Sequence, residues 1–280
     1  MESNETLKAA LANVILYQVD CEKGSGPKLA KKYSVRGYPT FVMLNTQGEE
    51  TDRWMGYDDS DTAEWVGTMD DARSDLRPIP AKKKAYDEDP TLMLAKSLAR
   101  HSLFTGENAA AVNYLETVIE LNDEPEREPR YRHAIFEATA RGAKEMQFSL
   151  DQDQSRAKDV VKDPDVEPGT LLEVAYTKGK VARAVGHMGL YTPYLTKAVK
   201  ATEGSDDESI QKFRGYLMPD YALHVEKDEE QAITLRKGRM PEGWLDDPGE
   251  LNGFAWWCYE NRINLEEAED LALRGARLAS

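Results

Sequence analysis

The fold of the first part of this chain is decided by the stretch Val35-Arg36-Gly37-Tyr38-Pro39-Thr40-Phe41-Val42-Met43-Leu44. Proline has no N–H to donate to a sheet, so Pro39 belongs at the first residue of a strand or on a sheet edge. X-Pro is the common place for a cis peptide bond, and this corner is expected to hold one between Tyr38 and Pro39. The stretch therefore predicts a proline corner that leads directly into an apolar strand.

Upstream of the corner, the sequence predicts two helices and a further strand. Residues 6–12 have the apolar spacing of a helix. Residues 14–19 form a near-continuous apolar run, which is typical of a strand covered on both faces. A helix carrying Leu29, Ala30 and Tyr33 follows, with Pro27 at its first turn. The run 14–19, this helix and a strand over 40–45 are expected to form a right-handed βαβ unit.

Downstream of the corner, the pattern continues as a hairpin and a helix. Asn45-Thr46-Gln47-Gly48 predicts the hairpin loop, because its glycine can adopt positive φ. Residues 53–57 complete the return strand. Asp61 is the predicted N-cap of the next helix, with Glu64 three residues on. The residues that this helix is expected to bury are Trp65, Met69 and Ala72.

These elements, in the order strand, short helix, proline corner, strand, hairpin, strand and helix, resemble the second half of the thioredoxin fold. The resemblance covers about residues 1–75, roughly a quarter of the chain, and several features agree in order and spacing. They are Asp20 after the apolar run, the segment 28–41, Gly48 in the turn and Gly56 after the next strand. The fold class expected for this part is therefore α/β, as a partial thioredoxin-like fold.

The resemblance implies a peptide site at the proline corner. In thioredoxin-like folds the backbone before the cis-proline pairs with an extended substrate peptide, which is a short case of strand addition. This role carries over to Gly37, Tyr38 and Pro39, with Gly56 and Tyr57 as neighbours on the same edge. Protein or peptide substrates are the partners expected there. The alternative is that the corner is present only because the fold requires it.

The chain lacks the Cys-x-x-Cys redox centre that the thioredoxin family carries at the start of its first long helix. Met1-Glu2-Ser3 resemble the residues that follow such a motif, so we expect Met1 to be an internal residue of a longer thiol–disulfide oxidoreductase. This chain is then expected to be inactive as given. The alternative is a non-catalytic interaction scaffold that uses both of its domains.

The two cysteines lie far apart in the sequence, which excludes a disulfide framework. Cys21 follows Asp20 in a predicted turn. A half-buried turn residue is favoured there over a reactive thiol, because no histidine or second cysteine lies near it in sequence to lower its pKa. A peroxidase or glutathione-dependent transferase on the same fold is disfavoured by the position of Cys21. Cys258 lies on a predicted helix, where a small core residue is the better interpretation.

Composition and charge restrict the class of partner. The chain has 280 residues, enough for two domains. Its 36 basic and 51 acidic residues give a net charge of −15, which repels nucleic acid and anionic lipid. No window approaches the roughly 18 apolar residues of a membrane span. The first residues do not resemble a signal peptide. The compartment stays open, although relatives with this layout are often exported to the bacterial envelope.

A break over 77–84, with two prolines and a lysine run, is predicted as the linker between two domains. A thioredoxin-like domain is expected over 1–76 and an all-α domain over 85–280. Two amphipathic helices within 92–123 resemble one tetratricopeptide-type hairpin, and residues 251–272 look like another. Further helices are expected over 131–148, 170–188, 190–202 and 208–226, with polar loops over 152–169 and 203–209. The helical domain is therefore predicted as degenerate tetratricopeptide-like repeats, with an irregular helical bundle as the alternative, and a protein partner is the kind of ligand expected for it.

No motif for catalysis or for a cofactor stands out. The four histidines, at positions 101, 133, 187 and 224, have no mutual helical spacing and no partner cysteine, so no metal site is expected. No Walker loop or Ser-His-Asp order is present. Large aromatic residues of the helical part could line a peptide groove, but core packing is favoured. They are Tyr191, Tyr194, Tyr216, Tyr221, Trp244, Trp256 and Trp257.

Overall fold

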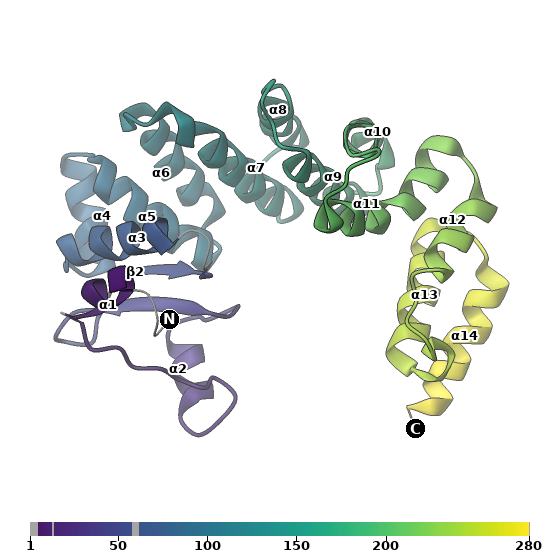
Figure 1. Ribbon diagram of the computed structural model, residues 1–280, viewed down its shortest axis with the longest axis horizontal. Helices are drawn as coiled ribbons and strands as arrows, with labels where there is room; N and C mark the ends of the chain where they lie inside the picture. The colour runs from purple at the N-terminus through teal and green to yellow at the C-terminus, as the bar shows by residue number, and fades with distance from the viewer. Residues whose placement is uncertain (1–4, 13, 58–61, 280) are drawn as a thin grey trace. The chain divides into compact units, whose positions relative to one another are not determined.

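The computed structural model describes residues 5–12, 14–57 and 62–279, which are mostly helical with one small sheet (Figure 1). The chain divides into two compact units, Met1–Arg156 and Ala157–Ser280. The first unit holds the sheet and the helices around it, and the second is helical. The coarse expectation of an α-plus-β part followed by helices is confirmed. None of the described helices is long and apolar enough to cross a membrane.

The proline corner and the hairpin form as the sequence predicts. The Tyr38–Pro39 peptide bond is cis. Strand β1 (Thr40–Leu44) begins at the next residue and pairs antiparallel with β2 (Glu50–Met55). In the loop between them, Gly48 has φ +74°, and the Asn45 side-chain oxygen accepts hydrogen bonds from two loop amides at 3.0 Å. A short polar loop with one left-handed glycine thus closes the hairpin.

Two helices cover one face of this hairpin and form its core. They are α1 (Glu5–Leu11) and α3 (Thr62–Ser74). Three rings meet there: Phe41 stacks on Trp54 at 5.6 Å between centroids and meets Trp65 edge-on at 5.1 Å. The predicted burial of Trp65, Met69 and Ala72 is confirmed. The predicted N-cap Asp61 lies outside the described residues, as do Met1-Glu2-Ser3.

The predicted strand over 14–19, and with it the βαβ unit, is wrong. These residues form neither strand nor helix, and the side chain of Ile15 is 98% exposed. A strand of a parallel sheet needs a neighbour that takes its backbone hydrogen bonds, and in the described part of the chain β1 pairs with β2 alone. The helix that follows is confirmed as α2 (Gly26–Lys32), with Pro27 in its first turn.

The predicted linker over 77–84 is largely helical. Helix α4 (Ile79–Glu88) begins directly after Pro78, and its side chains Ile79 and Lys82 are buried. The prolines here start a helix, because proline is tolerated at the first helical positions, where no N–H is needed. The lysine run therefore forms part of helix α4. This helix lies inside the first compact unit and does not separate two units.

The rest of the first unit is a series of helices. The predicted pair is confirmed as α5 (Leu92–Thr105) and α6 (Asn108–Leu121), and Gly106 ends α5 with φ +82°. After a 3₁₀ turn (η2, Pro125–Arg127), α7 (Glu128–Lys144) packs on α6. The predicted loop over 152–169 is wrong in its first half, because α8 (Leu150–Val161) occupies it. Helix α8 spans the boundary between the two units, and its buried apolar residues Ala157 and Val160 lie among too many polar residues to give a clear helical pattern.

The second unit contains six helices in its described residues, three of which the sequence places closely. They are α9 (Pro168–Ala184), α10 (Thr192–Ala201) and α11 (Glu208–Tyr221). Helix α11 continues as a π-helical turn (η4, Ala222–Glu226), and α12 (Glu229–Lys237), which the sequence missed, follows it.

The C-terminal pair is confirmed as α13 (Pro248–Asn261) and α14 (Leu265–Leu278). Two further 3₁₀ turns lie in this unit, η3 (Met188–Leu190) and η5 (Trp244–Asp246). Cys258 is fully buried among Leu251, Phe254 and Leu271, as a core residue. Asn264 occupies the N-cap of α14, but its side-chain amide donates to the Glu267 carboxylate at 2.6 Å instead of capping a backbone N–H.

Candidate functional site

The proline corner is held in place by hydrogen bonds of its own neighbours. The Thr40 hydroxyl donates to the Gly37 carbonyl oxygen at 2.7 Å, and the Gly56 N–H donates to the Pro39 carbonyl oxygen at 2.9 Å. Gly56 has φ +79°, a conformation that glycine adopts without strain. Tyr38 points out of this frame with 66% of its surface exposed. The three predicted site residues therefore lie together at an ordered and accessible corner.

The backbone of β1 next to this corner has an open edge. In an antiparallel ladder, residue pairs alternate between those whose N–H and C=O groups face each other and those whose groups face outward. Because Pro39 accepts from Gly56, the groups of Thr40 and then Val42 face away from β2. Within the described part of the chain, no backbone group bonds to these outward groups.

Strand β2, in contrast, is covered. Helix α5 packs against it, and its residues Arg100 and His101 bond to carboxylates of β2. The Arg53 guanidinium lies 5.6 Å from the centre of the Phe104 ring of α5. Figure 1 shows α3, α4 and α5 on the β2 side of the hairpin. The hairpin therefore has one covered strand and one strand with a free edge.

Cys21 lies beside the corner, which sequence spacing did not show. The Cys21 thiol lies near the Tyr38 hydroxyl, and the pKa of Tyr38 is raised by desolvation and by nearby Cys21 and Glu22. Cys21 is half-buried, as predicted, and both cysteines of the chain are free. Disulfide exchange by the thioredoxin mechanism needs a resolving cysteine next to the first. The described residues bring one thiol, that of Cys21, to this corner.

A buried charged group lies under the covered strand, and we call it the Asp52 cluster: Asp52, Lys82, Ser97 and Arg100. Arg100 donates to both Asp52 carboxylate oxygens, at 3.0 and 2.7 Å. Lys82 Nζ donates to Ser97 Oγ at 2.9 Å and lies 3.9 Å from the Asp52 carboxylate. A lysine hydrogen-bonded to a serine is also the arrangement in which the lysine can act as the base that activates a serine nucleophile. Lys82 and Ser97 are at most 2% exposed, however, so substrate cannot reach them and the cluster is structural.

A second set of charges joins the same elements. The Arg53 guanidinium donates to both carboxylate oxygens of Glu50, and His101 Nδ1 lies 2.8 Å from Glu50 Oε1. Burial alone would raise the pKa of Glu50, but the hydrogen bonds from His101 and Arg53 outweigh it and leave this pKa lowered. Glu107, bonded to Lys83 at 2.9 Å, lies on the other side of His101. Sequence analysis predicted no special role for His101, because its partner Glu50 lies 51 residues away along the chain.

The second unit encloses a polar group of its own. The Tyr191 hydroxyl donates to Asp220 Oδ2 at 3.0 Å, and Arg183 donates to the same oxygen. His224 Nε2 lies 3.1 Å from the Asn261 side-chain oxygen. Burial raises the pKa of Tyr191 and lowers that of His224. These contacts join α9, α11, η4 and α13, and Tyr191 is fully buried, so the group serves packing.

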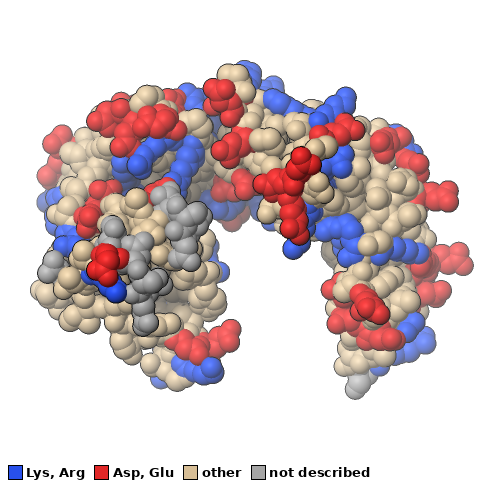
Figure 2. All heavy atoms as spheres, in the orientation of Figure 1, with Lys and Arg blue, Asp and Glu red and all other residues tan. Residues whose placement is uncertain are grey.

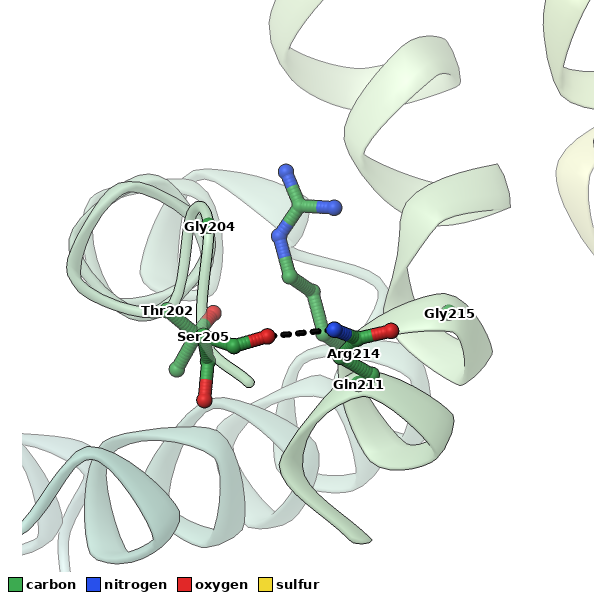
Figure 3. A pocket seen from close by; sticks show the side chains of 6 residues that line it. All are labelled: Thr202, Gly204, Ser205, Gln211, Arg214 and Gly215. Carbon is green, nitrogen blue, oxygen red and sulfur yellow. Dashed lines mark hydrogen bonds between the residues drawn. The ribbon is translucent and has the colours of Figure 1, made fainter. Parts of the chain in front are cut away.

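A small hollow of about 150 Å³ lies between the loop after α10 and the middle of α11 (Figure 3). Its polar groups already have partners in the chain. Gln211 donates to the Ser205 carbonyl oxygen, Arg214 Nε to Val199 O at 3.3 Å, and Thr202 Oγ1 to Ala198 O at 2.7 Å. The hollow is therefore a seam between two elements and offers little for a ligand to bind. It is lined by Thr202, Gly204, Ser205, Gln211, Arg214 and Gly215.

The large aromatic residues of the helical part divide between core and surface. Tyr191, Tyr194 and Trp257 are buried, as core packing predicts, whereas Tyr216 and Trp256 are 45% and 56% exposed. Sequence spacing could not separate the two groups, because both lie on amphipathic helices whose outer face is not purely polar.

No model of a protein family, no curated protein and no solved structure matches this chain.

Proposed function

We propose that this chain binds extended polypeptide at the open edge of β1, next to the proline corner. The observation that carries the proposal is the pair of outward-facing backbone positions, Thr40 and Val42, which lie beside the exposed Tyr38. An added strand would satisfy these N–H and C=O groups, while side-chain contacts would select alternate residues of the peptide. The exposed Tyr38 ring supplies apolar contact area at low cost in side-chain entropy.

The first part of the chain is further proposed to be the peptide-binding half of a thioredoxin-like domain. The proline corner that leads into β1, the antiparallel hairpin and the helix α3 over its face support this proposal. The segment 14–20 differs from a thioredoxin-like domain, because it forms no strand. The helix pairs α5/α6 and α13/α14 support a tetratricopeptide-like interaction domain. A binding scaffold is favoured over an oxidoreductase, because the corner holds the single thiol of Cys21. We expect no turnover of insulin disulfides.

Proline at position 42 tests the edge directly. The outward N–H of Val42 would be lost in Val42→Pro, whereas the ladder to β2 does not use this N–H. Val42→Thr is the matched control, because it keeps the N–H and the β-branched shape. The probe is a fluorescently labelled protein chain that has been reduced and alkylated, so that it is unfolded and cannot form a disulfide.

We expect Val42→Pro to weaken binding of this probe by about tenfold or more, and Val42→Thr to change it by less than about twofold. Tyr38→Ala, which lies outside the strand, is expected to weaken binding by a similar factor. It provides a second test of the site if the proline variant does not fold. Circular dichroism melting curves check that each variant is folded. Unchanged affinity in both Val42→Pro and Tyr38→Ala would overturn the proposal.

A further inference from the structure

Two cations flank a pair of aromatic rings across α9, α11 and the turn after α12 in the second unit. Lys180 Nζ lies 4.1 Å from the centre of the Tyr176 ring. Tyr176 meets the Tyr216 ring edge-on at 5.7 Å, and the Arg239 guanidinium lies 4.6 Å from the centre of Tyr216. These four side chains, with Arg236 one turn before Arg239, form what we call the cation–aromatic row. Figure 2 shows Lys and Arg side chains gathered where Figure 1 labels α11 and α12.

The cations of this row have no acidic partner in the described chain. Lys180, Arg236 and Arg239 form no ion pair with a described carboxylate, whereas the adjacent Lys237 binds both oxygens of Glu267 at 2.7 Å. The Arg239 guanidinium donates to the Gly215 carbonyl oxygen at 3.1 Å. Arg236 Nε is buried and has no hydrogen-bond partner. In a chain with 51 acidic and 36 basic residues, unpaired cations gathered at one place need an explanation.

The two guanidiniums also repel each other. Partial desolvation by the neighbouring side chains, and then the nearby charge of Arg236, lower the pKa of Arg239, although its side chain is largely exposed. Like charges held together gain free energy when an anion binds between them, and a guanidinium can present two parallel N–H groups to one carboxylate. Arg239 is exposed, as are Lys180 and Tyr216. The row is therefore accessible as well as electrostatically unsatisfied.

A carboxylate-bearing polypeptide fits the row better than a nucleic acid does. Single-stranded nucleic acid binds by stacking bases on free aromatic faces. Here Lys180 already lies over Tyr176 and Arg239 over Tyr216. A net charge of −15 also opposes a long polyanion. An acidic segment with few carboxylates would meet the cations directly, and its apolar side chains would contact the ring edges.

We propose that the cation–aromatic row is the docking site for an acidic segment of another protein. The carboxylates of the segment pair with Lys180 and Arg239, with Arg236 adding to the positive potential, and the Tyr216 edge packs against the segment. The opposing view is that the rings alone hold these cations as surface packing. The two views differ in the affinity of the row for anionic peptide.

The test measures binding of two labelled probes of matched length and charge to the full chain by fluorescence anisotropy. One probe is an oligopeptide of glutamate interrupted by phenylalanine, and the other is single-stranded oligo-dT. The variant Lys180→Gln/Arg239→Gln removes two charges from the row. The matched control Lys158→Gln/Arg277→Gln removes two charges from exposed side chains elsewhere in the same unit. A further variant, Arg239→Lys, keeps the charge but loses the guanidinium fork.

We expect the peptide to bind the wild-type chain with an affinity that falls as salt is added. The row variant is expected to weaken it by about tenfold or more, the control by less than about twofold, and Arg239→Lys by an intermediate factor. Melting curves confirm that the variants fold. Equal loss in the row variant and the control, tighter binding of oligo-dT than of peptide, or no peptide binding to wild type would each overturn the proposal.

Discussion

The Asp52 cluster of the first unit and the cation–aromatic row of the second unit gather charges in opposite ways. Asp52 and Lys82 are 0% and 1% exposed and find their partners in Arg100 and Ser97. Lys180 and Arg239 are exposed, lie over aromatic rings and meet no described carboxylate. Enclosed and paired charges fix elements of the fold to one another. Open and unpaired charges keep hydrogen-bonding capacity for a partner, and the following predictions test this difference.

The largest effect is expected from removing the centre of the enclosed cluster. Asp52→Ala leaves Lys82 buried and Arg100 partly buried without their counter-charge, so we expect the free energy of unfolding to fall by about 3–5 kcal/mol. Urea titration followed by circular dichroism measures it. The control is Asp70→Ala, which removes a mostly exposed partner of Arg73 and should cost less than about 1 kcal/mol. Similar losses of unfolding free energy in both variants would show that the Asp52 cluster does not hold the elements of the fold together.

The reactivity of the two cysteines provides a second test of the difference between exposed and enclosed groups. Cys21 is half-buried, whereas Cys258 is fully buried and burial raises the pKa of its thiol to about 11. Since the thiolate is the reactive form, Cys21 should react with Ellman's reagent at least about 100-fold faster than Cys258 in the native chain. Cys21→Ser should remove the fast phase and leave the slow one. Two equal rates would contradict the placement of Cys258 in the core.

The pH dependence of stability tests the Glu50 pair with a smaller effect. The pKa of Glu50 is lowered below its ordinary value of 4.5, so the unfolded chain binds its proton more tightly than the folded chain does. Its contribution is therefore fully present above the unfolded pKa and is lost as pH falls through the lower folded pKa. Between about pH 5 and pH 3 we expect Glu50→Gln to lose about 1 kcal/mol less stability than wild type.

Urea titrations at several pH values measure these slopes, and Glu88→Gln serves as the control because Glu88 is exposed. A slope unchanged by Glu50→Gln would mean that the hydrogen bonds from His101 and Arg53 do not favour the charged carboxylate.

The smallest effect is expected at an open pair within one helix. Lys84 and Glu88 of α4 lie 3.9 Å apart, with their side chains 81% and 70% exposed. Screening by water and the entropy of two long side chains offset their attraction. Glu88→Gln should change the free energy of unfolding at neutral pH by less than about 0.5 kcal/mol in urea titration. A loss as large as that of Asp52→Ala would overturn the distinction between enclosed and open pairs.

Several elements were predictable because their signals are local. Pro39 fixes the start of β1, a glycine ends the hairpin loop, and the spacing of Trp65, Met69 and Ala72 shows the buried face of α3. The peptide-binding role of the corner stays a prediction, although its residues do lie together and exposed. That the β1 edge is open could not be predicted, because pairing depends on which other segments reach the strand.

The sequence by itself determined the proline corner, the hairpin and the presence of many of the helices, because turn residues and apolar periodicity act within a few positions of the chain. The tertiary structure alone decided which strand edge is covered, that 14–19 is no strand, and which charges are paired. Asp52 and Arg100 are 48 residues apart, so no local pattern joins them. In the row, Lys180 and Tyr176 are four residues apart on α9, but Tyr216 and Arg239 come from distant segments of the chain, and no local pattern joins them to the first pair. Their partnership depends on packing, which brings distant residues together and sets their burial.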